Sequence, residues 1–109
     1  MTRLLDTTAP IALAALPTAS VVDGDPQAGA RTLASVVGAD IGVWELTPGT
    51  VTDIEVDEVF VVLSGSATLA FDDGEVIELV PGVAVRLRAG DRTTWTVHVP
   101  LRKVYVAGP

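Results

Sequence analysis

Turn signals recur at short intervals through most of this chain and divide it into short segments. The runs between them are rich in valine, leucine, threonine and isoleucine, a composition typical of β-strands. No window shows a helical hydrophobic period long enough to predict a helix. Eight such runs separated by turns predict an all-β fold, an antiparallel sandwich or barrel. The turn signals after residue 36 are Gly38, Pro48-Gly49, Ser64-Gly65, Asp72-Asp73-Gly74, Pro81-Gly82, Ala89-Gly90 and Pro100.

Several of these runs alternate between apolar and polar residues, as strands with one face in a core do. In the segment 66–71, for example, Ala67, Leu69 and Phe71 share one face. The segment 59–63 is instead apolar on both faces. A strand of that kind is either central in a packed sandwich or covered by a partner subunit. The second case would make the protein a homodimer, which is the state that we expect.

The first 32 residues differ from the rest of the chain. Pro10, Pro17 and Pro26, together with the segment DGDPQAGA at 23–30, disfavour regular structure. We therefore predict an extended N-terminal arm over residues 1–32, with one or two edge strands, and a β-barrel domain over residues 33–109. The arm could lie along the barrel or reach across to another chain.

Length and composition restrict the class of protein. The 109 residues suit one domain with one core. Without a cysteine, neither a disulfide framework nor a thiolate metal site is available, which fits a reducing cytoplasm. No apolar run approaches the roughly 20 residues of a membrane helix, and we interpret the short apolar run at 11–20 as part of the mature chain. We expect a cytoplasmic protein with no membrane partner.

The charged residues are segregated along the chain. Residues 40–78 contain ten carboxylates and no lysine or arginine, whereas residues 86–103 contain five basic residues and one acid. The net charge of −7 would repel phosphate backbones, so we expect no nucleic-acid partner. The segregation has two explanations that the sequence leaves open. Either acidic strands pair with basic ones, or a ligand site is polarised.

Four segments carry a recognisable pattern: GVWELTPG (42–49), DEVFVVLSGSATL (57–69), DDGEVIELVPGVAVRLRAG (72–90) and TWTVHVPLRKVYV (94–106). Together they resemble the cupin superfamily, and most closely its small single-domain branch, which includes the ureidoglycine aminohydrolase-like cupins. The resemblance implies a conical jelly-roll β-barrel whose interior holds a divalent metal ion or a small ligand.

Metal-binding cupins have the pattern G-x5-H-x-H-x3,4-E-x6-G, and this chain matches its second half. Glu58 and Gly65 match the acid and the last glycine, but no register places a histidine before them. In the second family pattern, Thr93 and Val97 replace the histidine and the asparagine. Tight binding of a transition metal needs three or four converging ligands, so we expect no metal ion and no cofactor.

The other polar residues near this pattern are expected to point elsewhere. Asp53, Glu55 and Asp57 alternate away from Glu58 in an extended strand, which predicts a solvated acidic edge. The only histidine, His98, alternates with residues that the resemblance places inside the barrel. We therefore expect His98 on the outer surface.

The resemblance also implies which residues would bind a ligand in the barrel interior. Burial beside Phe60 would make Glu58 a candidate catalytic acid or base. The alternative is a structural ion pair between Glu58 and an arginine, either Arg86, Arg88 or Arg102. The expected ligand-binding residues are Trp44, Glu58, Phe60, Thr93 and Trp95.

Three functions are compatible with the sequence. The first is a metal-free cupin that binds a small polar metabolite in the barrel interior. The second is an isomerase, cyclase or hydrolase of a small molecule, with Glu58 as general acid or base. The third is a structural dimerisation module that pairs through the segment 59–63. We favour the first, and we leave open whether the protein is an enzyme, because one acid does not define a reaction.

Overall fold

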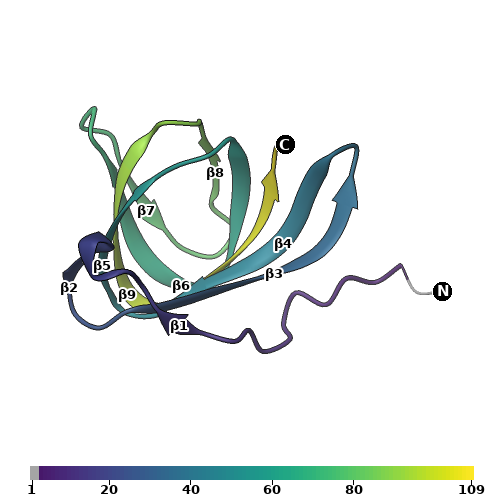
Figure 1. The fold of residues 1–109 in the computed structure, drawn as a ribbon, viewed down its shortest axis with the longest axis horizontal. Helices are drawn as coiled ribbons and strands as arrows, with labels where there is room; N and C mark the ends of the chain where they lie inside the picture. Colours follow the sequence, from purple (N-terminus) through teal and green to yellow (C-terminus); the bar gives the residue numbers. More distant parts are fainter. Residues whose placement is uncertain (1–2) are drawn as a thin grey trace.

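The computed structural model describes residues 3–109. These residues form nine β-strands and one short 3-10 turn, which confirms the predicted all-β fold. The described part of the chain contains no α-helix, and so no helix in it is long and apolar enough to cross a membrane. The elements, labelled in Figure 1, are β1 (Ala14–Ala15), η1 (Thr18–Ser20), β2 (Val21–Asp23), β3 (Gln27–Val36), β4 (Ala39–Leu46), β5 (Gly49–Ile54), β6 (Glu58–Phe71), β7 (Val76–Leu79), β8 (Ala84–Leu87) and β9 (Arg92–Ala107).

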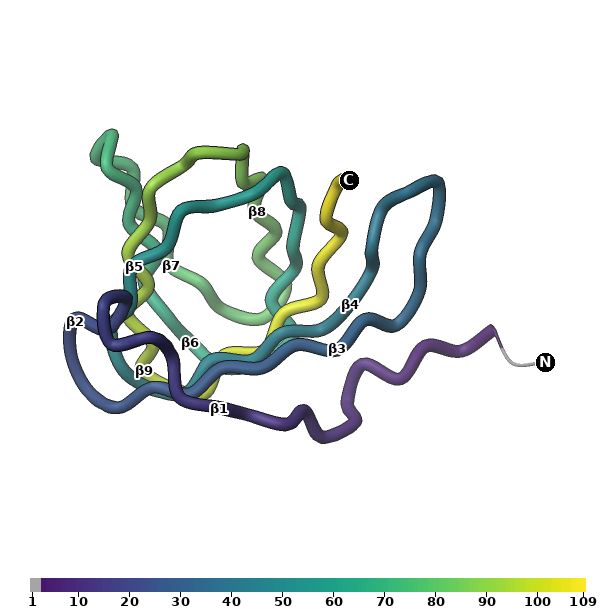
Figure 2. Tube along the Cα trace, viewed as in Figure 1, coloured from purple at the N-terminus to yellow at the C-terminus, as the bar shows by residue number. Residues whose placement is uncertain are grey.

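The two longest strands, β6 and β9, organise the fold. They pair in antiparallel fashion from Glu58 opposite Ala107 to Phe71 opposite Thr93. The C-terminal half of β9 also pairs with β4 and its N-terminal half with β5, while β6 also pairs with β7 and β8. The antiparallel sheet therefore curls into a barrel, and the β3–β4 hairpin extends beyond it (Figures 1 and 2).

A glycine allows β6 and β9 to approach closely where both strands bend. The pairing of the two strands shifts in register between Val62 and Ala67. Gly65 lies in this stretch with a φ angle of +89°, and a side chain there would overlap the carbonyl group of Pro100. Glycine tolerates both the left-handed backbone and the close contact. The turn signal at Ser64 and Gly65 is thus a bend within one long strand and not a break between two strands.

Apolar side chains from all sides of the barrel meet in one core. The predicted alternation in the segment 66–71 is present, since Ala67 and Leu69 are buried. In the segment 59–63, Phe60 points into the core, whereas Val59 on the other face is 42% exposed. The outer face of this segment is therefore partly exposed in the single chain, and the homodimer stays a prediction. The largest fully buried side chains are those of Phe60, Leu46, Leu69, Leu79, Leu87 and Leu101.

The N-terminal segment contributes two short strands to the sheet. β1 pairs with β3, and β2 pairs with β5. The longer strand β3 begins at Gln27 and continues past residue 32, the predicted end of the arm. No proline follows Pro26 until Pro48, so the chain can keep its ladder with β4 over this length. The division into an arm (1–32) and a barrel domain (33–109) stays a prediction.

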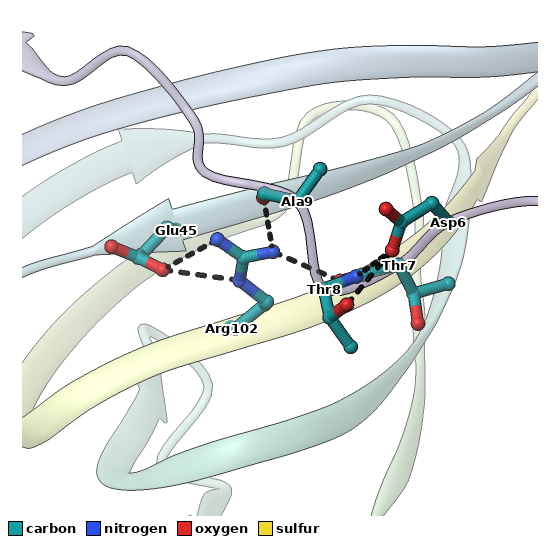
Figure 3. A network of polar contacts seen from close by, with 6 residues as sticks. All are labelled: Asp6, Thr7, Thr8, Ala9, Glu45 and Arg102. Carbon is teal, nitrogen blue, oxygen red and sulfur yellow. Dashed lines mark hydrogen bonds and ion pairs between the residues drawn. The ribbon is translucent and has the colours of Figure 1, made fainter.

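Arg102 holds the beginning of the N-terminal segment against the barrel (Figure 3). Its Nη1 atom donates hydrogen bonds to the carbonyl oxygens of Thr7 at 2.9 Å and Ala9 at 2.8 Å. Its Nε atom donates to Oε1 of Glu45 at 3.1 Å. In this structure the segment therefore lies along the chain's own barrel, which is one of the two paths that the sequence left open.

Candidate functional site

A cavity of about 270 Å³, open to solvent on one side, lies beside strands β4, β6 and β9 and reaches buried side chains of the barrel. β4 supplies Trp44, β6 supplies Glu58, and β9 supplies Trp95 and Lys103. These three strands are neighbours in the sheet, so the ladder itself brings their inward side chains together. Its aromatic and charged lining residues are Trp44, Asp53, Glu55, Glu58, Trp95, Lys103 and Tyr105.

An ion pair between Lys103 and Glu58 forms the charged centre of the cavity. The Nζ atom of Lys103 donates a hydrogen bond to Oε2 of Glu58 at 2.7 Å. The two side chains are 6% and 11% exposed, so both charges are largely removed from water. Burial of a charge is costly unless a partner compensates for the lost hydration. Each of these two groups compensates the other.

Three aromatic rings surround the Lys103 ammonium group. The Nζ atom lies 4.5 Å from the ring centroid of Trp44, 4.4 Å from that of Phe60 and 4.9 Å from that of Trp95. The Trp95 ring also packs on the other two, at centroid distances of 5.4 Å and 5.6 Å. Ring faces carry partial negative charge and stabilise a cation within about 6 Å. We call these three rings and the Glu58 carboxylate the ammonium cage.

A second carboxyl group, that of Glu55, is buried at the cavity wall. Oε2 of Glu55 accepts hydrogen bonds from Oγ1 of Thr93 at 2.6 Å and from Nε1 of Trp95 at 3.1 Å. Glu55 is 8% exposed. This burial raises the pKa of the Glu55 carboxyl, repulsion from Asp53 adds to the effect, and the two hydrogen bonds oppose it. The protonated form of Glu55 therefore persists to higher pH than that of an exposed glutamate.

The inward orientation of Glu55 corrects the prediction of a solvated acidic edge. Strand β5 ends at Ile54, so strand alternation no longer decides where the next side chain points. The backbone N–H and carbonyl of Glu55 both bond to the turn at 90–91, which fixes the loop against the barrel. Glu55 thus leaves the row of Asp53 and Asp57, both of which are exposed.

The expected partner of Glu58 is an arginine, whereas the observed partner is Lys103. Arg86 and Arg102 each pair with a different acid outside the cavity, and Arg88 is exposed. Alternation along β9 explains the difference. Arg102 and Lys103 are adjacent, so they point to opposite faces of the strand, and Lys103 takes the inward one.

The five predicted ligand-binding residues come together in the structure. Trp44, Glu58 and Trp95 line the cavity. Phe60 is fully buried within the ammonium cage, and Thr93 supports the second carboxyl group from behind. Three of the five could therefore touch a ligand, while the other two position groups that could.

Sequence reasoning did not select Glu55 and Lys103, which complete the site. Lys103 had a signal, because it lies two residues from Leu101 and therefore shares the inward face of the strand with that buried leucine. Glu55 had none, because its orientation depends on where β5 ends. His98 is exposed on the outer face, where its Nε2 atom lies 3.3 Å from Oγ1 of Thr68.

The cavity does not offer the ligand set of a metal-binding cupin. Within residues 3–109, no group of three or more His, Cys, Asp or Glu side chains could hold a metal ion. Glu58, which matches the acidic ligand of the family pattern, is bound to an ammonium group that would repel a metal cation. The side chains in the described residues therefore do not fit the divalent metal ion of a metal-binding cupin. That this protein binds a ligand without a metal ion is a proposal that needs an experiment.

A larger hollow of about 650 Å³ lies outside the barrel, where β5 and β6 flank β9. Thr52, Arg92 and Thr94 line it, and Thr94 alternates with the inward residues of β9. The interior cavity is smaller, but its charged and aromatic groups converge on one nitrogen atom. For that reason it is the better candidate for specific recognition.

A sequence model of the EutQ-like cupin domain family matches residues 38–105, which is more than half of the chain. The chain belongs to this family. The resemblance to the cupin superfamily is thereby confirmed. A comparison with curated proteins gives no match.

Solved structures share the fold of this EutQ-like cupin domain. A protein of unknown function from Pseudomonas syringae pv. tomato aligns with a TM-score of 0.79 and 23% identity, over 94% of this chain and 46% of that protein. EutQ of Clostridium difficile aligns with a TM-score of 0.69 and 20% identity, over 87% of this chain and 75% of that one. Ectoine synthase from P. lautus aligns with a TM-score of 0.68 and 19% identity, over 87% of this chain and 68% of that one. This chain thus spans less than half of the Pseudomonas protein, and the likeness is one of fold.

Proposed function

We propose that this EutQ-like cupin domain binds a small polar metabolite in the barrel cavity without a metal ion. The observation that carries the proposal is the convergence of an ion pair, a second carboxyl group and aromatic rings on one cavity. The cavity volume of about 270 Å³ is slightly below the roughly 300–1,000 Å³ of typical ligand pockets. The ligand is therefore a small molecule.

The lining also restricts the chemistry of the ligand. Asp53, Glu55 and Glu58 are among the residues that line this space, and each carboxyl group has more acceptor capacity than its protein partners use, so a ligand with hydroxyl, amide or amine donors would find acceptors. The half-buried ring of Trp44 offers an apolar face for the rest of the molecule. Proteins of the same fold include an ectoine synthase and DMSP lyases. That analogy supports a small-molecule site, although fold alone does not define a function.

A second candidate function is acid–base catalysis on a small molecule by an isomerase, cyclase or hydrolase. Glu55 favours it, because burial raises the pKa of its carboxyl at the cavity wall and Thr93 and Trp95 fix its position. Glu58 is the acid expected from the sequence, but it is bound to Lys103. Glu55 is thus the better proton carrier. Membership of the ureidoglycine aminohydrolase-like branch would place the protein in this class and remains a prediction.

A thermal-shift screen of chelator-treated protein tests the binding proposal. A panel of polyols, amines, amino acids and small carboxylic acids is added one compound at a time. A compound at 100 times its Kd stabilises the fold by about 2.7 kcal/mol, which raises Tm by roughly 10 °C or more. If the protein also converts that compound, and Glu55→Gln abolishes the conversion, the result would favour the second candidate, an enzyme that uses Glu55.

Matched variants locate the site of any compound that binds. Glu55→Gln and Trp44→Ala change the cavity wall, and both are expected to weaken the shift. Asp57→Asn changes a neighbouring exposed acid outside the cavity and is expected to preserve it. A shift that survives both cavity variants would place the binding site elsewhere on the barrel.

A further inference from the structure

Lys103 is the only lysine in the chain, and its position inside the barrel is unusual. Lysines normally keep the ammonium group in water even when the aliphatic part of the side chain is buried. The side chain of Lys103 is instead 6% exposed, and the ammonium cage surrounds its Nζ atom. In protein structures a significant cation–π contact occurs roughly once per 70–80 residues. Here three rings converge on one nitrogen atom.

We propose that the ammonium cage is a cation-binding site which the chain fills with its own Lys103, in place of a metal ion at Glu58. The cage has the two components that recognise an organic ammonium group, namely aromatic faces and a carboxylate. The Glu58 carboxylate supplies the hydrogen-bond acceptor at 2.7 Å. Lys103 thus acts as a fixed internal cation.

Lys103 and a metal ion exclude each other at Glu58. The Nζ atom occupies the space directly in front of Oε2 of Glu58. A divalent ion bound to the same carboxylate would meet the ammonium charge at close range in a site shielded from water, where repulsion is strong. The positive charge in the cavity is therefore covalently attached, and chelators cannot remove it.

The register of the sheet explains why lysine can reach the cage. Lys103 lies opposite Val62 on β6, four residues along that strand from Glu58. The side chains of Lys103 and Glu58 together bridge this distance inside the barrel, since their end atoms lie 2.7 Å apart, and the Nζ atom thereby lies among the three rings. A shorter side chain at position 103 would leave the cage open.

A first test uses the unmodified protein. Because Lys103 is the only lysine, lysine-selective ¹⁵N labelling gives one side-chain signal. We expect an ammonium signal that exchanges slowly with water and is shifted upfield by the three rings. We also expect Lys103 to resist reductive methylation with formaldehyde in the folded state, while the N-terminal amine reacts. Methylation of Lys103 as fast as free lysine would overturn the proposal.

A second test empties the cage and refills it. Lys103→Ala removes all but the first carbon of the side chain, and n-propylammonium replaces the missing atoms. We expect Tm to fall by about 10 °C or more and to recover by roughly 5–10 °C when propylammonium is present at ten times its Kd. Neutral 1-propanol and equal sodium chloride should not restore it. If Lys103→Ala is unfolded in buffer, the same reagents are compared for their ability to refold it.

Control variants make the second test decisive. The double variant Glu58→Gln/Lys103→Met removes both charges and keeps the volume, so it should fold and show no response to propylammonium. Arg86→Ala breaks an exposed ion pair and should also show none. Equal rescue by 1-propanol, or equal rescue of Arg86→Ala, would contradict a cation-binding cage. Stabilisation of the wild-type chain by Zn²⁺, Mn²⁺ or Ni²⁺ that Glu58→Gln abolishes would show that Glu58 is a metal ligand.

The cage holds Lys103 in the ligand-free chain, so these measurements do not depend on the proposed metabolite. Failure to find a metabolite would leave the cage intact, and failure of ammonium rescue would leave the metabolite site intact.

Discussion

The Nζ atom of Lys103 and Oε2 of Glu58 lie 2.7 Å apart inside a barrel built largely by the two strands that carry them. Both residues face inward although neither belongs to a typical apolar core. Their pairing means that the interior of this cupin is held together by charge as well as by apolar packing. Substitutions that remove one charge, both charges or neither should therefore have separable effects.

Removal of one partner should destabilise the fold more than removal of both. Glu58→Gln leaves the Lys103 ammonium buried without a counter-charge, and we expect a loss of about 3 kcal/mol in the free energy of unfolding. The double variant Glu58→Gln/Lys103→Met should recover most of that loss. Urea unfolding at pH 7 measures the free energy of unfolding of the wild type, of Glu58→Gln and of the double variant. Asp57→Asn, which breaks an exposed ion pair, should cost about 1 kcal/mol or less. Equal losses for Asp57→Asn and Glu58→Gln would contradict this account.

Glu55 should make stability depend on pH in a defined direction. Burial raises the pKa of its carboxyl above the ordinary value of 4.5, so the folded chain holds this proton more tightly than the unfolded chain. The resulting stabilisation is complete below pH 4.5 and is lost as the pH rises through the folded pKa. Urea unfolding of wild type and Glu55→Gln from pH 4 to 8 measures it. The stability of wild type relative to Glu55→Gln should fall as pH rises, and a difference that is constant or rises with pH would contradict the burial argument.

Gly65 should be the most sensitive of the glycines at turn signals. Gly65→Ala combines a left-handed backbone with overlap against the carbonyl group of Pro100, and we expect a loss of about 3 kcal/mol. Gly74→Ala is a matched control, because its φ angle is +98° but an added Cβ would meet no atom within 4 Å. It should cost about 1 kcal/mol. Equal costs, measured by thermal or urea unfolding, would show that the close approach of β6 and β9 does not limit this position.

Arg102 should hold the first residues of the chain to the barrel. Arg102→Met removes the donors to the carbonyl oxygens of Thr7 and Ala9 but keeps much of the side-chain volume. We expect faster proteolysis within residues 3–13, because the segment loses its side-chain anchors. Arg86→Met is the control, since Arg86 contacts a different part of the barrel. Unchanged proteolysis in Arg102→Met would mean that contacts other than those of Arg102, such as the pairing of β1, hold the segment.

The fold was accessible from the sequence because its signals are local. Turn residues and alternating polarity predicted an all-β chain, and the cupin pattern predicted the barrel. Local signals did not reveal that Gly65 bends a continuous strand, since a turn and a bend have the same residues. They also did not predict that β3 would begin at Gln27, because its ladder depends on β4 as a partner.

The candidate site was only partly accessible for the same reason. Trp44, Glu58 and Trp95 were selected from the family pattern, and they line the cavity. Lys103 was missed because it was grouped with the other basic residues of 86–103, and the face of the strand on which it lies was not considered. Glu55 was missed because its inward turn follows the end of a strand, and strand ends are poorly defined by sequence.

Titration of the two tryptophan indole N–H signals in chelator-treated, ¹⁵N-labelled protein tests metal-free binding most directly. The chain has two tryptophans, and both line the cavity. A metabolite bound there should shift both indole signals, above all that of Trp95, which donates to Glu55. We expect saturable shifts without added metal, and we expect Glu55→Gln to weaken them. Shifts that appear only after a divalent metal ion is restored would contradict metal-free binding.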